Sequence, residues 1–221
     1  HDTTQALEAS WAKDREILNA NGLSIDIVRE APGFKEAVIF RDNDRVLLQW
    51  TRDRAFRFFP LVEDDQLGLV LHPFDLATNK VLALAGRLEP RDWVDVLGCH
   101  DKVQQFGYLA WAACGKDPGF NPASILSDAR RSSRYSQAEL DELSFSGAAP
   151  DAVSLGSKWH AVLKEADEIC AALAGAAPGV CILEQEGTLC RRAPGDLRDA
   201  FADGRILFHH GSIKGAFPTV R

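Results

Sequence analysis

Residues 71–97, LHPFDLATNKVLALAGRLEPRDWVDVL, decide the fold of this chain, because they predict two helices joined by a short corner. Asp75 is a good N-cap, since its short carboxylate can accept hydrogen bonds from the free amides of the next turn. A helix is expected from about residue 76 to residue 86. Pro90 suits the first turn of the following helix, where its missing N–H is no loss.

Charged side chains gather at this corner. Lys80 lies four residues from both Leu76 and Leu84, so it is expected within an otherwise apolar stripe of the first helix. The second helix is expected to carry two aspartates on one face, because they are three residues apart. The corner should therefore bring together one lysine, two arginines and two aspartates: Lys80, Arg87, Arg91, Asp92 and Asp95.

This group of charges has two interpretations. In the first, it is a salt-bridge network that stabilises a helix pair, with Asp92 favouring the N-terminus of the second helix. Charged clusters more often serve solvation and pairing than chemistry. In the second, it is a site for a polyanion, in which a lysine faces phosphates and carboxylates place a metal or hold the lysine. Residue spacing alone leaves both open.

The run DLATNKVLALAGRLEPRDWVDVL resembles the nucleotidyltransferases of the abortive-infection toxin type (AbiEii/AbiGii-like), within the DNA polymerase β-like superfamily. Lys80 matches the lysine of the family's helical motif. Arg91, Asp92 and Asp95 match its Arg-Asp-x-x-Asp motif. The resemblance covers roughly residues 1 to 135. It implies that Lys80, Arg87 and Arg91 bind the nucleotide, and that Lys80, Asp92 and Asp95 are the catalytic residues.

The resemblance also implies a function and its partners. The reaction would be the magnesium-dependent transfer of a nucleotidyl group from a nucleoside triphosphate to an acceptor, which could be RNA or protein. The protein could be the toxin of a toxin–antitoxin system and bind an antitoxin. A second hypothesis belongs to another class: a catalytically degenerate nucleotidyltransferase fold that serves as a binding or partner module.

Carboxylates on adjacent strands hold divalent metals in polymerase β-like enzymes. The opening HDTTQALEASW resembles the segment immediately after the family's Asp-x-Asp metal motif, and that motif itself is not in this chain. A further carboxylate is expected near residue 49, where this chain has Gln49. Asp53 is the preferred substitute and Asp26 the second choice. Each could equally be a solvent-facing acid at or near the end of a strand.

A further cationic cluster follows the predicted helix at about residues 122–131. Arg130, Arg131 and Arg134 are the best candidates for contacting a polyanion outside the core site. The alternative, which the position favours, is that these arginines complement the dipole at the C-terminus of the helix.

The remaining periodicities predict an α/β (α+β) fold. A mixed or antiparallel sheet with helices packed on it is expected in the first part of the chain, and the resemblance implies that residues 1–100 form a nucleotidyltransferase-like core. A mainly helical region with a small β-containing tail is expected over residues 101–221. Helices are expected at 4–20, 103–114, 122–131, 155–173 and 195–203, strands at 23–29, 37–40, 45–51 and 205–209, and hairpins at 37–51 and 180–190.

Composition bounds the function. The net charge of −7 over 221 residues argues against broad non-specific nucleic-acid binding. No apolar run reaches membrane-spanning length, and no signal peptide is visible. The five cysteines are scattered without a C-x-x-C pair, which predicts reduced thiols and a cytoplasmic protein. The absence of methionine and the start at His1 suggest that this chain is not the whole natural protein.

Overall fold

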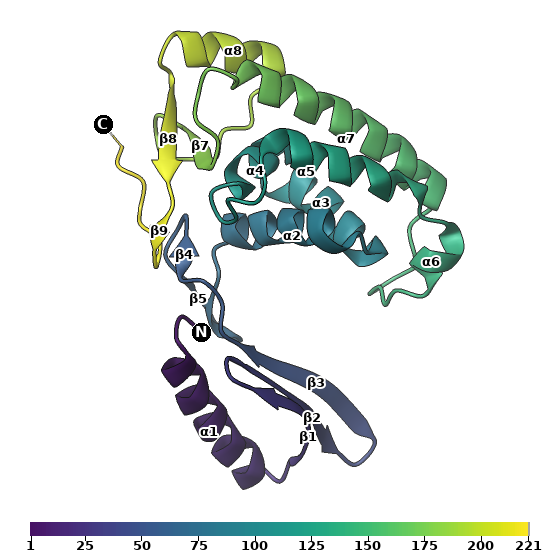
Figure 1. Cartoon of the computed structure of the whole chain (residues 1–221). Coiled ribbons are helices and arrows are strands. Elements are labelled where there is room, and N and C mark those ends of the chain that lie inside the picture. Colours follow the sequence, from purple (N-terminus) through teal and green to yellow (C-terminus); the bar gives the residue numbers. More distant parts are fainter. Residues whose placement is uncertain (221) are drawn as a thin grey trace. The chain divides into compact units, whose positions relative to one another are not determined.

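The computed structural model describes residues 1–220, apart from the side chains of residues 133 and 134. The chain forms two compact units, His1–Ala55 and Phe56–Arg221. Both helices and antiparallel strands are present (Figure 1), which confirms the predicted α+β class. Among the described residues every named strand pairs antiparallel, so the antiparallel alternative for the sheet is the one observed.

The first unit consists of one helix on a three-stranded sheet. Helix α1 (Thr4–Ala20) is followed by β1 (Ser24–Ala31), β2 (Phe34–Arg41) and β3 (Asp44–Thr51), which pair in the order β1-β2-β3. Alternate residues of β2 are buried, as the two-residue period of a strand requires when one face is covered. The core between helix and sheet contains Leu7, Trp11, Ala37, Ile39 and Trp50. The predicted helix at 4–20 and the hairpin at 37–51 are confirmed.

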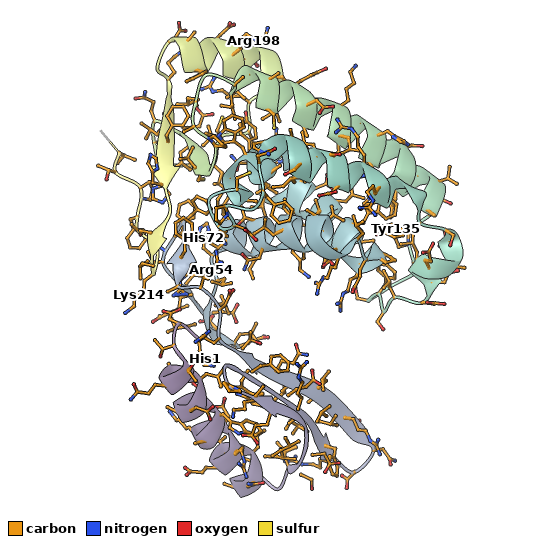
Figure 2. The ribbon with its side chains drawn as sticks, in the orientation of Figure 1. His1, Arg54, His72, Tyr135, Arg198 and Lys214 are labelled. Carbon is orange, nitrogen blue, oxygen red and sulfur yellow. The ribbon has the colours of Figure 1, made fainter. Side chains whose placement is uncertain are left out.

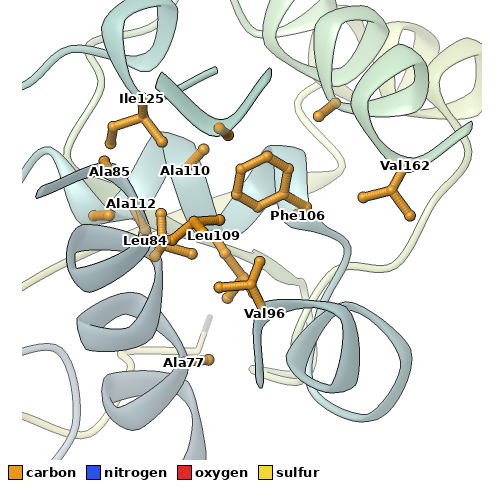
Figure 3. Packing of buried hydrophobic residues seen from close by; sticks show 14 of the residues in the cluster. Ala77, Leu84, Ala85, Val96, Phe106, Leu109, Ala110, Ala112, Ile125 and Val162 are labelled. Atoms are coloured by element: carbon orange, nitrogen blue, oxygen red, sulfur yellow. The ribbon is translucent and has the colours of Figure 1, made fainter. Parts of the chain in front are cut away.

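The second unit is mainly helical. Its helices are α2 (Pro73–Arg87), α3 (Pro90–Lys102), α4 (Phe106–Ala113), α5 (Pro122–Ala129), the 3₁₀ helix η1 (Arg130–Arg134), α6 (Gln137–Asp141), α7 (Ala152–Ala172) and α8 (Pro194–Ala202). Every residue of α4 is buried, because α2, α5 and α7 all pack around it. Figure 3 shows Leu84, Val96, Leu109 and Ile125 meeting in this core. A helix that is apolar on all sides belongs in the interior of a domain.

Short strands complete the second unit. They are β4 (Phe56–Arg57) with β9 (Ser212–Ile213), β5 (Val62–Asp64) with β6 (Gly68–Val70), and β7 (Val180–Glu184) with β8 (Ile206–His210). The predicted hairpin at 180–190 is present as a short antiparallel pairing, in which residue 183 bridges residue 189 and the amide of Cys190 donates to the carbonyl of Ile182 at 3.1 Å, while β8 is the longer partner of β7. The buried Gln104 amide also holds this hairpin, donating to the carbonyls of Ile182 and Cys190 at 3.1 and 2.6 Å.

The expected division after residue 100 differs from the observed one after residue 55. Helix α3 runs through residue 100. Val96 and Leu97 before this point share one core with Phe106 and Leu109 after it. The helix pair at 71–97 therefore packs with the later helices, because its apolar face is buried against α4. Among the described residues, no helix is both long enough and apolar enough to cross a membrane.

Asp75 does not cap α2 as predicted. The N-cap is His72, whose Nδ1 accepts a hydrogen bond from the amide of Phe74 at 3.2 Å. Asp75 lies in the first turn with its side chain fully buried, where it accepts from the amides of Phe58 and Phe59 at 2.9 and 3.0 Å. Lys116 supplies the counter-charge, 2.8 Å away. The buried carboxylate thus joins α2 to the segment that follows β4.

The close approach of α4 and α7 depends on Gly107. A Cβ at this position would lie 2.7 Å from the Cβ of Ile169 and 2.9 Å from the Cα of Ala166, which is backbone and cannot move aside. We expect Gly107→Ala to destabilise the protein by about 1–3 kcal/mol, because overpacking a tight contact forces helices apart. Urea unfolding followed by circular dichroism measures the change.

Gly98 provides the matched control, because it also lies within a helix but a Cβ there would meet nothing within 4 Å. Gly98→Ala should stabilise the protein by up to about 1 kcal/mol, since alanine loses less backbone entropy on folding. Equal effects of the two substitutions would contradict the tight α4–α7 contact.

Candidate functional site

The corner between α2 and α3 is two residues long. Leu88 is the C-cap of α2 and adopts the left-handed conformation, with φ 53° and ψ 46°. Glu89 is the N-cap of α3, and Pro90 follows as its first residue, as predicted from the sequence. Because a left-handed residue turns the chain sharply, α3 doubles back and packs against α2.

The predicted charges do meet at this corner. Arg87 donates two hydrogen bonds to Asp92, one of 2.7 Å from Nε to Oδ2 and one of 3.0 Å from Nη2 to Oδ1. Lys80 Nζ lies 2.6 Å from Oδ2 of Asp95 and 3.9 Å from Oδ1 of Asp92. We call these four residues, Lys80, Arg87, Asp92 and Asp95, the corner cluster. The paired geometry of Arg87 and Asp92 is the strong, directional form of a carboxylate–guanidinium contact.

The cluster has one buried residue, and its other three side chains are partly exposed. The side chain of Asp92 is fully buried, whereas those of Lys80, Arg87 and Asp95 are 40%, 46% and 45% exposed. The expected apolar stripe around Lys80 is confirmed at Leu84, which is buried, and wrong at Leu76, which is exposed; the buried face of α2 also includes Ala77 and Val81. Lys80 therefore stands where an ion from solvent can reach it.

Electrostatics favour the charged form of Arg87. The Asp92 carboxylate accepts two hydrogen bonds from Arg87 and raises the pKa of its guanidinium. Cys99, one turn after Asp95, has a thiol whose pKa is raised by burial, with Asp95 acting in the same direction and Lys80 against it. The cluster as a whole balances two positive charges against two negative ones.

Arg91 is not part of the cluster. Its Nε lies 2.8 Å from a carboxylate oxygen of Glu89, and both side chains are about half exposed. Asp26 and Asp53, the predicted metal ligands, belong to the first unit. Asp26 is exposed on β1, and Asp53 follows β3, where its Oδ1 accepts from the amide of Arg54 at 2.7 Å.

The second predicted cationic cluster is only partly described. Arg130 Nη2 lies 2.6 Å from both carboxylate oxygens of Asp167 on α7. These two residues line a cavity of about 440 Å³ between α4, α5 and α7 that does not include the corner cluster. Arg131 is 3.9 Å from Asp128, three residues earlier, and the side chain of Arg134 lies outside the described residues.

The corner cluster does not have the donor set of a ready-made magnesium site. Magnesium requires several oxygen ligands, and the oxygens of Asp92 and Asp95 already face Arg87 and Lys80. Within residues 1–220, no three His, Cys, Asp or Glu side chains gather as metal ligands would. A role for magnesium therefore stays a prediction.

Tyr135 is a corner residue that sequence reasoning missed. Its hydroxyl donates a hydrogen bond to the carbonyl oxygen of Leu88, and its ring packs against that of Trp93 with centroids 5.5 Å apart. No local signal could reveal this contact, because the two partners lie 47 residues apart in the sequence. The same holds for Lys116 and Asp75, which are 41 residues apart.

Removing the buried carboxylate should test the corner directly. We expect Asp92→Ala to lower the free energy of unfolding by about 1–3 kcal/mol, because Arg87 loses its partner and a buried space opens. Asp95→Ala, which removes an exposed partner of Lys80, should cost no more than about 0.5 kcal/mol. Urea titration of both variants provides the comparison. Equal losses in the free energy of unfolding would contradict the role of Asp92 as the buried carboxylate on which the cluster depends.

Comparisons with protein-family models, with curated proteins and with solved structures gave no match for this chain. The geometry of the corner cluster, with its exposed cations above a buried aspartate, is the observation that bears on function. Membership of the abortive-infection nucleotidyltransferases, which residues 75–97 lead us to expect, stays a prediction.

Proposed function

We propose that the protein binds a nucleoside triphosphate at the corner cluster and transfers its nucleotidyl group to an acceptor. The acceptor attacks the α-phosphate, its new bond to phosphorus replaces the bond to the leaving group, and pyrophosphate departs. Membership of the abortive-infection nucleotidyltransferases, and a role as the toxin of a toxin–antitoxin pair, are part of the same proposal. Both rest on the matching of Lys80, Arg91, Asp92 and Asp95 to the family's motifs.

One observation carries the proposal. Lys80 and Arg87, from the middle and the end of α2, both reach the buried carboxylate of Asp92 on α3 while remaining partly exposed. A triphosphate carries several negative charges, and it would meet two cations whose positions are already restricted. Such preorganisation lowers the cost of ordering side chains when the ligand binds.

The four residues of the cluster would then have different roles. Lys80 would leave Asp95 and contact phosphate oxygens as a point charge. Arg87 would contact them with the N–H groups that Asp92 does not use. Asp92 would position the arginine, and Asp95 would hold Lys80 while no ligand is bound. Magnesium would enter with the triphosphate as its counter-ion, and the site at the corner is proposed without Asp53 and Asp26, which belong to the other unit.

The acceptor and the partners are proposed more broadly. An RNA or a protein could accept the nucleotidyl group, and Arg130, Arg131 and Arg134 would contact an RNA acceptor. We further propose a cytoplasmic location, because all five cysteines are free. An antitoxin would be the natural protein partner of an enzyme whose product is harmful.

The binding-module hypothesis is favoured by Gln49. This residue stands on β3 where the family resemblance implies a carboxylate, and its amide hydrogen-bonds Glu36 on β2. A glutamine carries no charge and is a weaker ligand for a divalent cation than a carboxylate. A chain that binds the triphosphate but transfers nothing would fit this hypothesis.

Nucleotide binding is the first test. We expect at least one of the four ribonucleoside triphosphates, with magnesium, to bind in isothermal titration calorimetry. Lys80→Ala should weaken that binding about tenfold or more, which is about 1.4 kcal/mol or more, because a direct charge contact to phosphate is lost.

Lys158→Ala is the matched control. Lys158 also pairs with a single exposed aspartate, Asp101, and its side chain is 41% exposed, close to the 40% of Lys80. It should leave binding unchanged. A second measurement, transfer of an α-labelled nucleotide to total RNA and protein, separates the enzyme from the binding module. No binding by the parent chain, or equal losses in the two lysine variants, would refute the proposed site.

A further inference from the structure

The corner holds a leucine in an unfavourable backbone conformation. Leu88 has φ 53° and ψ 46°, a region where a side chain crowds its own carbonyl and which glycine normally occupies. A C-cap of this kind ordinarily carries glycine or asparagine. Something in the surrounding structure must therefore keep Leu88 in this conformation.

Tyr135 supplies that restraint. Its hydroxyl donates to the carbonyl oxygen of Leu88, and its ring lies against Trp93, with centroids 5.5 Å apart and planes inclined by 47°. Figure 2 labels Tyr135 beside the α6 segment, close to the ends of α2 and α3. The tyrosine thus reaches the corner from a segment outside the helix pair.

The segment that carries Tyr135 is itself well anchored. The next residue, Ser136, caps α6 in a reciprocal capping box with Glu139. Leu140 of α6 is fully buried, and α6 packs on α3. Because the capping box and the buried Leu140 fix the backbone next to Tyr135, its side chain can resist a movement of the Leu88 carbonyl.

The conformation of Leu88 decides where Arg87 and Asp92 meet. Arg87 directly precedes Leu88, while the carbonyl of Glu89, which follows it, accepts from the amides of Asp92 and Trp93 at 3.0 and 3.3 Å. A rotation at Leu88 would therefore swing the first turn of α3 relative to the last turn of α2. The two hydrogen bonds between Arg87 and Asp92 depend on that relative position.

We propose that Tyr135 is a positioning residue of the anion site: by bonding the Leu88 carbonyl it holds the left-handed corner and keeps Arg87, Asp92 and Lys80 in register. The inference rests on the proposed function, since it concerns the same site. Tyr135 does not touch the phosphates. It acts through the backbone of Leu88.

The experiment measures binding of inorganic tripolyphosphate to the whole chain by calorimetry. Tyr135→Phe keeps the ring on Trp93 and removes only the hydroxyl. We expect it to weaken binding about three- to tenfold, the range of a single neutral hydrogen bond. Tyr108→Phe is the matched control, because its hydroxyl also donates to a backbone carbonyl, that of Arg192 at 2.9 Å, within a different core cluster. It should leave the affinity unchanged.

A second background separates positioning from general stability. Leu88→Gly places at the corner a residue that adopts the left-handed conformation without strain. In this background, Tyr135→Phe should reduce the free energy of tripolyphosphate binding by no more than about half of the reduction that it causes in the parent chain. The effect is smaller because glycine adopts the corner conformation without the hydrogen bond from Tyr135. The same loss in both backgrounds, no loss in either, or an equal loss in Tyr108→Phe would overturn the proposal.

Hydrogen exchange keeps this test independent of the proposed function. Tyr135→Phe should speed exchange of the amides of Leu88, Asp92 and Trp93, and Tyr108→Phe should not. If the parent chain binds no tripolyphosphate, the proposed function fails. Faster exchange at these amides in Tyr135→Phe would still support the restraint of the Leu88 backbone by Tyr135. Unchanged exchange at the three amides would overturn the proposal that Tyr135 restrains the corner at Leu88.

Discussion

The two hydrogen bonds between Arg87 and Asp92 are the interaction on which the rest of the corner depends. A fully buried carboxylate is stable only when its charge is matched and its lone pairs are bonded. Arg87 meets both requirements, and Lys80 adds a second, more distant cation. The buried aspartate therefore fixes the end of α2, the start of α3 and the direction of two cationic side chains at once.

This arrangement allows one group of charges to serve the structure and also the function that we propose. The side chain of Asp92 is fully buried and out of contact with solvent. Lys80 and Asp95, by contrast, form a partly exposed ion pair of the kind that contributes little to stability. An anion can separate such a pair at small cost. The salt-bridge network and the proposed polyanion site are alternatives when only spacing is considered. The geometry makes them compatible, because the network involves the buried Asp92 and the proposed site would use the exposed side chains.

Some of the site could be predicted from sequence, and some could not. Lys80, Arg87, Asp92 and Asp95 could be predicted to meet, because helical spacing and Pro90 define two helices and a short turn. The exclusion of Arg91 could not be predicted, since it depends on the rotation of α3 about its axis. Local chemistry predicts that Asp75 caps the helix, but the amides that it binds come from residues 58 and 59. Local rules cannot anticipate a partner from another segment.

By itself, the sequence determined the α+β class, the positions of most helices and strands, and the meeting of four charges at one corner. These features depend on residues within a turn or two of one another, through caps, periodicity and turn residues. Only the tertiary structure decided that β7 pairs with β8, that Lys116 lies against Asp75, and that the Tyr135 hydroxyl bonds the carbonyl of Leu88. These contacts join segments far apart in the chain, and the packing of the whole helical unit around α4 selects them.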